Sequence, residues 1–129
     1  MDRVTNEKLY EIAEEARSNA YAPFSKFHVG AALLTADGKV YTGVNIENSS
    51  YGATICAERT AFAKAISEGE RKFLKIAISA GDVESTPCGI CRQFMYEFAP
   101  EIEVITKADG ALRIRKLCQL LPDGFVLDQ

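Results

Sequence analysis

The chain has 129 residues and a formal net charge of −3, with a sequence pI of about 5.2. Hydrophobic residues make up 47% of it and charged residues 26%, as in ordinary soluble domains that bury a core. The acidic balance argues against a protein that grips nucleic acid polymers, which requires a basic surface. No apolar run approaches the length of a membrane span, and residues 1–6 carry no apolar signal region. We therefore expect a single domain, residues 1–129, in the cytoplasm.

The first half of the chain predicts a helix followed by a β-hairpin. Residues 5–19 place their apolar side chains on one face of a helix. Residues 27–34 form an apolar, β-rich run, and residues 40–46 form a returning strand. Asp37-Gly38 lies at the centre of the turn between them, which is a strong hairpin signal.

The second half alternates helices with strands. The predicted elements are a helix at 56–68, a strand at 73–79, a helix at 88–98, a strand at 102–105 and a helical stretch at 112–121. Such alternation implies crossovers and parallel pairing. We therefore predict an α/β fold, a three-layer α/β/α sandwich around a central mixed sheet. Open sheets of this kind bind ligands at helix N-termini beside strand ends.

Three cysteines and one glutamate form the most informative pattern. Cys56-Ala57-Glu58 is followed, after a long gap, by Pro87-Cys88-Gly89-Ile90-Cys91. Cys88 and Cys91 are three residues apart, so at the start of a helix their sulfurs point the same way. Cys56 opens another predicted helix, and helix N-termini favour thiolates. Three thiolates can bind Zn²⁺ and leave the fourth position open, as in catalytic sites. Glu58 would face that open position as the proton carrier.

Two other interpretations of the cysteines remain open. Cys88 and Cys91 could form a redox pair, or Cys118 could complete a structural four-cysteine zinc site. The upstream Cys-Ala-Glu segment and Pro87 favour the catalytic arrangement. Cys118 lies in an apolar run, so we expect it to be a buried core thiol. Arg59 is placed to offset the thiolate charge by donating hydrogen bonds.

The order of Cys, Glu two residues later, and Pro-Cys-x-x-Cys is an established signature of zinc deaminases. Five segments of this chain resemble, in order, those of the small cytidine deaminases. They are Tyr21-Ala22-Pro23-Phe24-Ser25-Lys26-Phe27-His28-Val29-Gly30-Ala31-Ala32, Asn45-Ile46-Glu47-Asn48, Cys56-Ala57-Glu58-Arg59-Thr60-Ala61, Pro87-Cys88-Gly89-Ile90-Cys91-Arg92-Gln93, and Leu120-Leu121-Pro122 with Phe125. The resemblance runs over roughly residues 21–125, and a cysteine as the first ligand is typical of the tetrameric branch.

This resemblance implies a zinc-dependent homotetramer that converts cytidine and 2′-deoxycytidine to uridine and 2′-deoxyuridine and releases ammonia, a reaction of pyrimidine salvage. By resemblance, the aromatic ring of Phe24 stacks on the base, and Asn45 and Glu47 bind the ribose 3′-hydroxyl. The Ala57 backbone and the catalytic Glu58 read the pyrimidine edge. Neighbouring subunits are expected to supply Ser49, Tyr51 and Phe125.

Elementary chemistry supports this interpretation. A carboxylate at Glu47 can accept a hydrogen bond from a sugar hydroxyl but would repel a 3′-phosphate, which favours free nucleosides over polynucleotides. Glu58 would act as base and acid in turn, so its pKa should lie near neutrality in the complex. Another aminopyrimidine nucleoside, of the antibiotic type, is an alternative substrate, and the ribose-binding pair argues against it. The residues around Phe24 suggest a loop, and His28 matches no zinc-ligand spacing.

Overall fold

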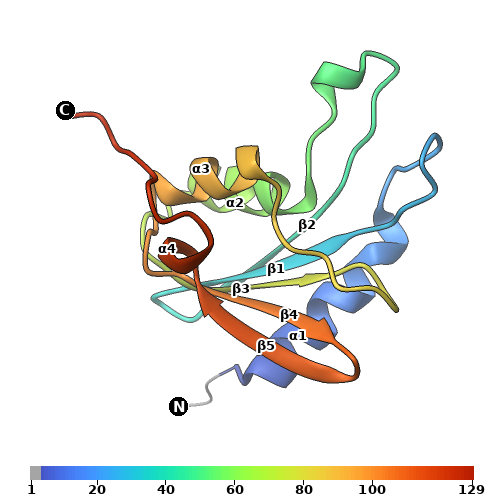
Figure 1. Cartoon of the computed structure of the whole chain (residues 1–129), viewed down its shortest axis with the longest axis horizontal. Coiled ribbons are helices and arrows are strands. Elements are labelled where there is room, and N and C mark those ends of the chain that lie inside the picture. The colour runs from blue at the N-terminus through green and yellow to red at the C-terminus, as the bar shows by residue number, and fades with distance from the viewer. Residues whose placement is uncertain (1–3) are drawn as a thin grey trace.

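A mixed five-stranded sheet forms the centre of the computed structural model, which describes residues 4–129 (Figure 1). Its strands are β1 (Gly30–Thr35), β2 (Val40–Val44), β3 (Phe73–Ser79), β4 (Glu103–Ala108) and β5 (Ala111–Lys116). Its helices are α1 (Asn6–Ala16), α2 (Ala57–Ser67), α3 (Gly89–Tyr96) and α4 (Leu117–Leu120), with 3-10 turns η1 (Arg17–Asn19) and η2 (Tyr51–Ala53). Residues 1–3, part of the N-terminal stretch considered above, lie outside the described residues.

The strands follow the order β2-β1-β3-β4-β5. The β3–β4 pair is parallel, as the alternation of helices and strands predicts, and the other three pairs are antiparallel. Helix α1 covers one face of the sheet, and α2 and α3 cover the other (Figure 1). The predicted three-layer α/β/α sandwich is therefore confirmed. Among residues 4–129, no helix is long and apolar enough to cross a bilayer.

Strand alternation builds two separate core layers. Ala31 and Leu33 of β1 pack toward α2 and α3, whereas Ala32 and Leu34 pack toward α1, because successive strand side chains point to opposite faces. The larger layer centres on Phe62, which is fully buried. Its apolar side chains hold α2 and α3 side by side, and these are the helices that carry the cysteines.

Gly43 allows α2 to lie directly on the backbone of β2. A Cβ at Gly43 would lie 2.3 Å from the Ala57 carbonyl oxygen and 2.4 Å from the Ala61 nitrogen. Both atoms belong to the helix backbone, so no side-chain rearrangement could make room. The start of α2, immediately after Cys56, is thereby fixed against the sheet.

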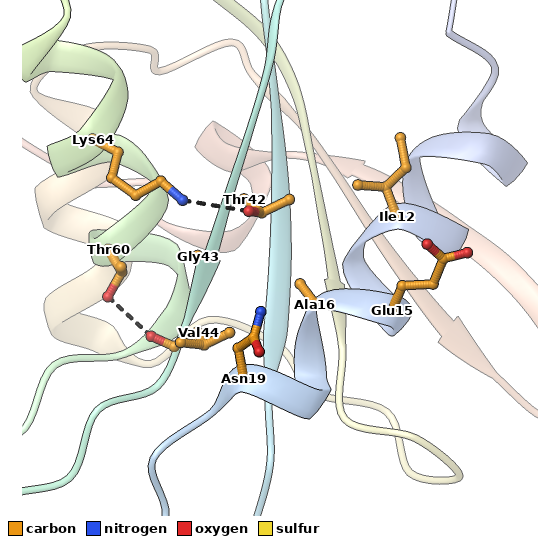
Figure 2. A pocket seen from close by; sticks show the side chains of 9 residues that line it. All are labelled: Ile12, Glu15, Ala16, Asn19, Thr42, Gly43, Val44, Thr60 and Lys64. Carbon is orange, nitrogen blue, oxygen red and sulfur yellow. Dashed lines mark hydrogen bonds between the residues drawn. The ribbon is translucent and has the colours of Figure 1, made fainter.

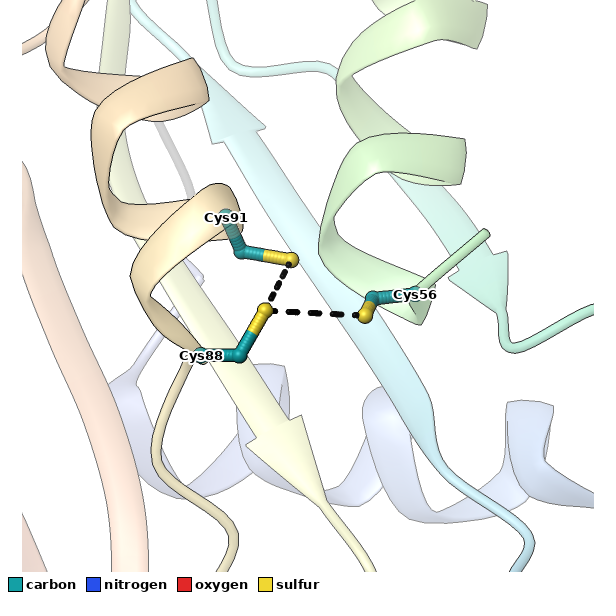
Figure 3. A group of neighbouring side chains, drawn as sticks. All are labelled: Cys56, Cys88 and Cys91. Carbon is teal, nitrogen blue, oxygen red and sulfur yellow. Dashed lines mark hydrogen bonds between the residues drawn. The ribbon is translucent and has the colours of Figure 1, made fainter. Parts of the chain in front are cut away.

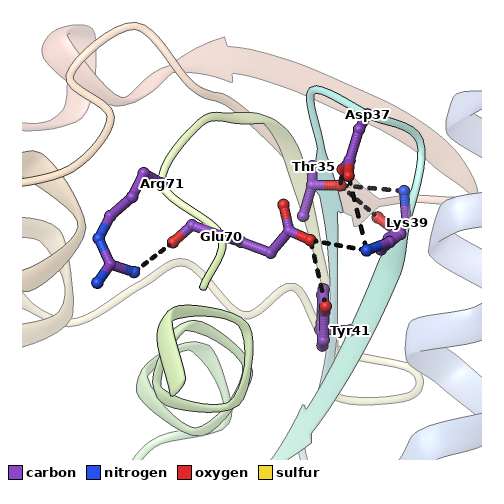
Figure 4. Close-up of polar contacts among 6 residues, drawn as sticks. All are labelled: Thr35, Asp37, Lys39, Tyr41, Glu70 and Arg71. Atoms are coloured by element: carbon purple, nitrogen blue, oxygen red, sulfur yellow. Dashed lines mark hydrogen bonds and ion pairs between the residues drawn. The ribbon is translucent and has the colours of Figure 1, made fainter. Parts of the chain in front are cut away.

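A polar network beyond the end of α2 holds it at a second point (Figure 4). The Glu70 carboxylate lies 3.3 Å from Lys39 Nζ and accepts a hydrogen bond from the Tyr41 hydroxyl at 3.4 Å. Arg71 donates to the Glu70 carbonyl oxygen at 2.8 Å. The connection after α2 is thus attached to the first residues of the hairpin strand β2, whereas the start of α2 packs on Gly43 near the other end of this strand.

The predicted helical stretch 112–121 is wrong in its first half. Residues 111–116 form strand β5, which pairs antiparallel with β4, and only Leu117–Leu120 is helical. Asp109 and Gly110 both adopt positive φ, 52° and 79°, which makes this Asp-Gly pair the turn of a second hairpin. The alternation of Leu112 and Ile114 with arginines is a strand pattern. The remaining predicted elements are confirmed, with shifts of a few residues at their ends.

Candidate active site

Three cysteine sulfurs converge where α2 and α3 begin (Figure 3). Cys56 is the N-cap of α2 and Cys88 the N-cap of α3, and Cys91 lies in the first turn of α3. The Cys56 and Cys88 sulfurs are 3.9 Å apart, and those of Cys88 and Cys91 are 3.4 Å apart. The predicted helix-terminal placement brings together two segments that are distant in the sequence, one with Cys56 and one with Cys88 and Cys91.

The donor set fits zinc in chemistry and in spacing. Two sulfurs bound tetrahedrally to one zinc at about 2.3 Å lie about 3.8 Å apart, which is close to the observed separations. Within residues 4–129, the group contains these three thiols and no fourth His, Cys, Asp or Glu ligand. Cys118 donates instead to Glu101 at 3.4 Å. It is half-buried, so the prediction of a buried core thiol is wrong, and it does not complete a four-cysteine site.

The pKa values of Cys56 and Cys91 are shifted in opposite directions. A hydrogen bond from Cys91 lowers the pKa of Cys56 to about 5, helped by Arg59. The hydrogen bond to Cys56 and burial raise the pKa of the Cys91 thiol. Arg59 Nη2 lies 3.9 Å from Cys56 Sγ and donates to the Thr54 carbonyl oxygen at 3.3 Å. A cation therefore lies beside the Cys56 thiolate, and it belongs to Arg59, the residue expected to compensate thiolate charge.

Glu58 is a buried carboxyl group beside the thiols. It lies in the first turn of α2 and is only 4% exposed, and its neighbour Ala57 is fully buried. Burial raises the pKa of Glu58 to about 7, and the charge on Cys56 adds to the effect. A carboxyl group of this pKa can both accept and give up a proton near neutral pH.

Phe24 and Tyr51 line a pocket with a volume of about 330 Å³, and the three cysteines are not among its lining residues. Their ring centroids are 6.2 Å apart in an edge-on arrangement. Glu47 also lines this pocket, together with Ser25, Asn48 and Thr54. Phe24 is 51% exposed and lies in a turn, which confirms the predicted loop and leaves its ring free to meet a ligand.

Glu47 organises the loop that carries Phe24. Its carboxylate accepts hydrogen bonds from the backbone N–H groups of Phe24, at 2.9 Å, and Ser25, at 3.1 Å. The Ser25 hydroxyl also donates to it and lowers the pKa of Glu47. The sequence analysis does not identify Ser25. Its hydroxyl, within a turn and beside an exposed aromatic residue, was the available signal.

Asn45 fixes the next part of the same loop, residues 27–29. Its side-chain oxygen accepts from the Val29 N–H at 3.0 Å, and its nitrogen donates to the Phe27 carbonyl oxygen at 2.7 Å. Asn45 and Glu47, the residues expected to contact ribose, thus fix segment 24–29.

The three residues expected from neighbouring subunits are exposed in this chain. Ser49 is exposed, Tyr51 is 78% exposed and Phe125 is 62% exposed. Figure 1 shows the loop between β2 and α2 and the C-terminal segment at opposite ends of the helical layer formed by α2 and α3. The chain therefore does not bring Phe125 to the loop that carries Ser49 and Tyr51.

A further hollow of about 310 Å³ lies between α1, β2 and α2 (Figure 2). Lys64 donates to the Thr42 hydroxyl within it, at 3.3 Å. None of the predicted site residues lines this hollow. The predicted metal ligands and Glu58 lie instead at the N-termini of α2 and α3.

Comparison with known proteins agrees with this geometry. A family model described as the cytidine and deoxycytidylate deaminase zinc-binding region matches residues 3–107. The chain belongs to this family. It is 48% identical over 123 residues to the cytidine deaminase of Sporosarcina psychrophila, covering 92% of this chain and 90% of that one. It is 47% identical over 128 residues to a probable cytidine deaminase of Dictyostelium discoideum, covering 97% and 86%.

A crystal structure of cytidine deaminase from Burkholderia pseudomallei superposes on the fold with a TM-score of 0.89. The two chains are 47% identical, and the match covers 94% of this chain and 99% of that one. The resemblance drawn from the motifs is confirmed, and with it the class of enzyme, a hydrolase of the cytidine deaminase family. The matched region includes Cys56, Cys88 and Cys91, whose sulfurs lie close enough together to hold a metal ion, consistent with Zn²⁺.

Proposed function

We propose that the protein deaminates free cytidine and 2′-deoxycytidine hydrolytically, giving uridine and 2′-deoxyuridine and releasing ammonia. The observation that carries this proposal is the buried Glu58 side chain, in the first turn of a helix that begins at one of three converging thiols. The similarity to proteins named cytidine deaminase supports the choice of substrate. In this proposal residues 1–129 are one catalytic domain that acts in the cytoplasm in pyrimidine salvage.

Cys56, Cys88 and Cys91 would hold the zinc ion. When bound, it supplies Lewis acidity that lowers the pKa of water and so provides a nucleophile near neutral pH. Glu58 accepts the proton that this water loses and delivers it to N3 of the cytosine ring, which makes C4 electrophilic. The oxygen of this water bonds to C4. Glu58 then carries the proton of the new C4 hydroxyl to the 4-amino group, the C4–N bond breaks to release ammonia, and C4 becomes the carbonyl of the product. Each transfer contributes about 10²- to 10⁴-fold to the rate, and Arg59 offsets the thiolate charge.

Two sets of groups recognise the nucleoside in this proposal, one at the base and one at the ribose. The Phe24 ring stacks on the base, and the Ala57 backbone with Glu58 reads the pyrimidine edge. Asn45 and Glu47 bind the ribose 3′-hydroxyl. A carboxylate has about four acceptor positions, and the loop occupies three of those of Glu47, so one is left for the sugar. Its negative charge disfavours a 3′-phosphate and therefore a polynucleotide.

The proposed assembly is a homotetramer in which neighbouring subunits complete each site with Ser49, Tyr51 and Phe125. The exposure of the Tyr51 and Phe125 rings supports this arrangement. A chain truncated before Phe125 should bind zinc but show a raised KM or no turnover. Mixing it with a Glu58→Gln chain should restore part of the activity, because some sites then combine an intact Glu58 with an intact Phe125. A strictly monomeric protein with full activity would overturn the shared site.

The decisive test of the reaction follows the fall in ultraviolet absorbance when zinc-loaded protein is mixed with cytidine or 2′-deoxycytidine. In Glu58→Gln, kcat should fall by more than the roughly 10²- to 10⁴-fold of a single proton transfer, because two transfers use this carboxylate. Zinc content and nucleoside affinity should persist. Glu68→Gln, an exposed change at the far end of α2, is the matched control. A Glu58→Gln enzyme that keeps most of its kcat would exclude Glu58 as the carrier. Loss of its zinc would instead make Glu58 a ligand.

A further inference from the structure

Helix α3 holds the C-terminal segment as well as two of the thiols. The Gln93 side chain donates from Nε2 to the Phe125 carbonyl oxygen at 2.8 Å. The Phe125 N–H donates in return to Gln93 Oε1 at 3.4 Å. One amide side chain thus pairs with both backbone polar groups of Phe125, as a neighbouring strand would.

Two further contacts on the same helix guide the chain to this point. Arg92 donates to the Leu120 carbonyl oxygen and to the Pro87 carbonyl oxygen, both at 2.7 Å. A Cβ at Gly124 would lie 2.6 Å from the Tyr96 ring, so the absence of a side chain lets the backbone lie against this ring. The segment is therefore fixed at residues 120, 124 and 125.

The anchoring acts on the backbone of Phe125 and leaves its ring free. Phe125 is 62% exposed, although both backbone groups of the residue are paired. A large apolar side chain held out from a fixed backbone can bind with less loss of conformational freedom than one on a loose tail. An amide side chain carries an acceptor oxygen and a donor nitrogen side by side, as this pairing needs.

We propose that Gln93 is a positioning residue for nucleoside binding, acting through Phe125. The proposal rests on the proposed role of Phe125 in completing a neighbouring site. Gln93 itself needs no contact with the nucleoside. Its effect should therefore appear in KM, while kcat stays near its original value because the thiols and Glu58 are not altered.

The test compares Gln93→Met with Glu97→Met. Methionine keeps the length of the glutamine side chain but removes both hydrogen bonds, and Glu97 is exposed one turn further along α3. In zinc-loaded protein, Gln93→Met should raise the KM for cytidine by about 5- to 150-fold, the range for losing two net hydrogen bonds. Its kcat should remain within about twofold, and Glu97→Met should match the wild type. In a Phe125→Ala background, Gln93→Met should cause no further rise in KM.

Hydrogen exchange at the Phe125 amide gives a measurement that does not depend on activity. This amide should exchange faster in Gln93→Met than in the wild type. An unchanged exchange rate, an unchanged KM, or an equal rise in KM in the Phe125→Ala background would each overturn the proposal. A Phe125→Ala enzyme with wild-type KM would also overturn it while leaving cytidine deamination intact. Failure of the wild type to deaminate cytidine would instead reject the proposed function, and the exchange rate would still test the anchoring.

Discussion

Replacing Gly43 with alanine tests whether the sheet sets the position of the catalytic helix. The added Cβ would lie 2.3 Å from a backbone oxygen of α2, whereas ordinary contacts begin at 3.4 Å. Helix α2 must therefore withdraw by about 1 Å, because the repulsion is steep at such separations. Neither clashing atom belongs to a side chain that could rotate away.

The expected loss of stability follows from two opposing terms. Overpacking a fitted core typically costs about 1–3 kcal/mol, and a clash between backbones belongs near the upper end. Alanine also reduces the conformational entropy of the unfolded chain, which stabilises the folded state by about 0.4–1 kcal/mol. The net loss is about 2 kcal/mol, which for a chain of this length lowers Tm by about 8 °C. A displacement of about 1 Å at Glu58 should also reduce kcat by about 100-fold.

Gly52→Ala is the matched control, because a Cβ there meets no atom within 4 Å. It should leave the free energy of unfolding unchanged or raise it by up to about 1 kcal/mol. Urea unfolding and initial rates on the zinc-loaded variants would measure both effects. If Gly43→Ala unfolds at the same urea concentration as the wild type and retains its kcat, close approach of α2 does not position the site.

Three other predictions follow from single contacts. Cys91→Ala should lose zinc, whereas Cys118→Ala should retain it, as metal analysis of the purified variants would show. The Thr106 hydroxyl lowers the pKa of Glu84, so the contribution of Glu84 to stability is present above its unfolded pKa of about 4.3 and is lost as pH falls through the folded value. Urea unfolding of wild type and Glu84→Gln should therefore differ at pH 7 and converge in acid. Glu70→Ala should lower the free energy of unfolding by about 1 kcal/mol. An unchanged free energy of unfolding would mean that the contacts of Glu70 with Lys39 and Tyr41 do not stabilise the fold.

The metal cluster was predictable from sequence because its geometry is largely local. Cys88 and Cys91 share one helical turn, and Cys56 precedes a second helix. Helix geometry therefore fixes most of the directions in which their sulfurs point. The sequence does not specify how closely the two helix ends approach each other. That distance depends on Gly43 and on packing around Phe62, which are contacts across the fold.

The second hairpin was missed because its strand is short and its pattern ambiguous. Leu112, Ile114 and Leu117 occur at spacings that suit either a helix or a strand when only a few residues are considered. The turn at Asp109-Gly110 resolves the ambiguity, since two successive residues at positive φ reverse the chain tightly. The same Asp-Gly signal had correctly predicted the first hairpin.

Polar contacts between distant segments had no usable signal in the sequence. Ser25 and Glu47 are 22 residues apart, and Gln93 and Phe125 are 32 apart. Their pairing depends on how segments that are distant in the sequence pack against each other, which residue spacing does not encode. Cys118 illustrates the converse error, because its apolar neighbours suggested burial although its sulfur donates to Glu101.

Contacts away from the thiols position the two helices that carry them. Gly43 and the Glu70 network hold the two ends of α2, and Arg92 ties the start of α3 to the C-terminal segment through Pro87 and Leu120. These contacts position the helix ends at which the sulfurs lie 3.4 and 3.9 Å apart. Contacts that hold ligand groups near their bound positions reduce the conformational freedom lost on binding. Mutations at Gly43 or Arg92, neither of which contributes a ligand atom, should therefore weaken zinc binding.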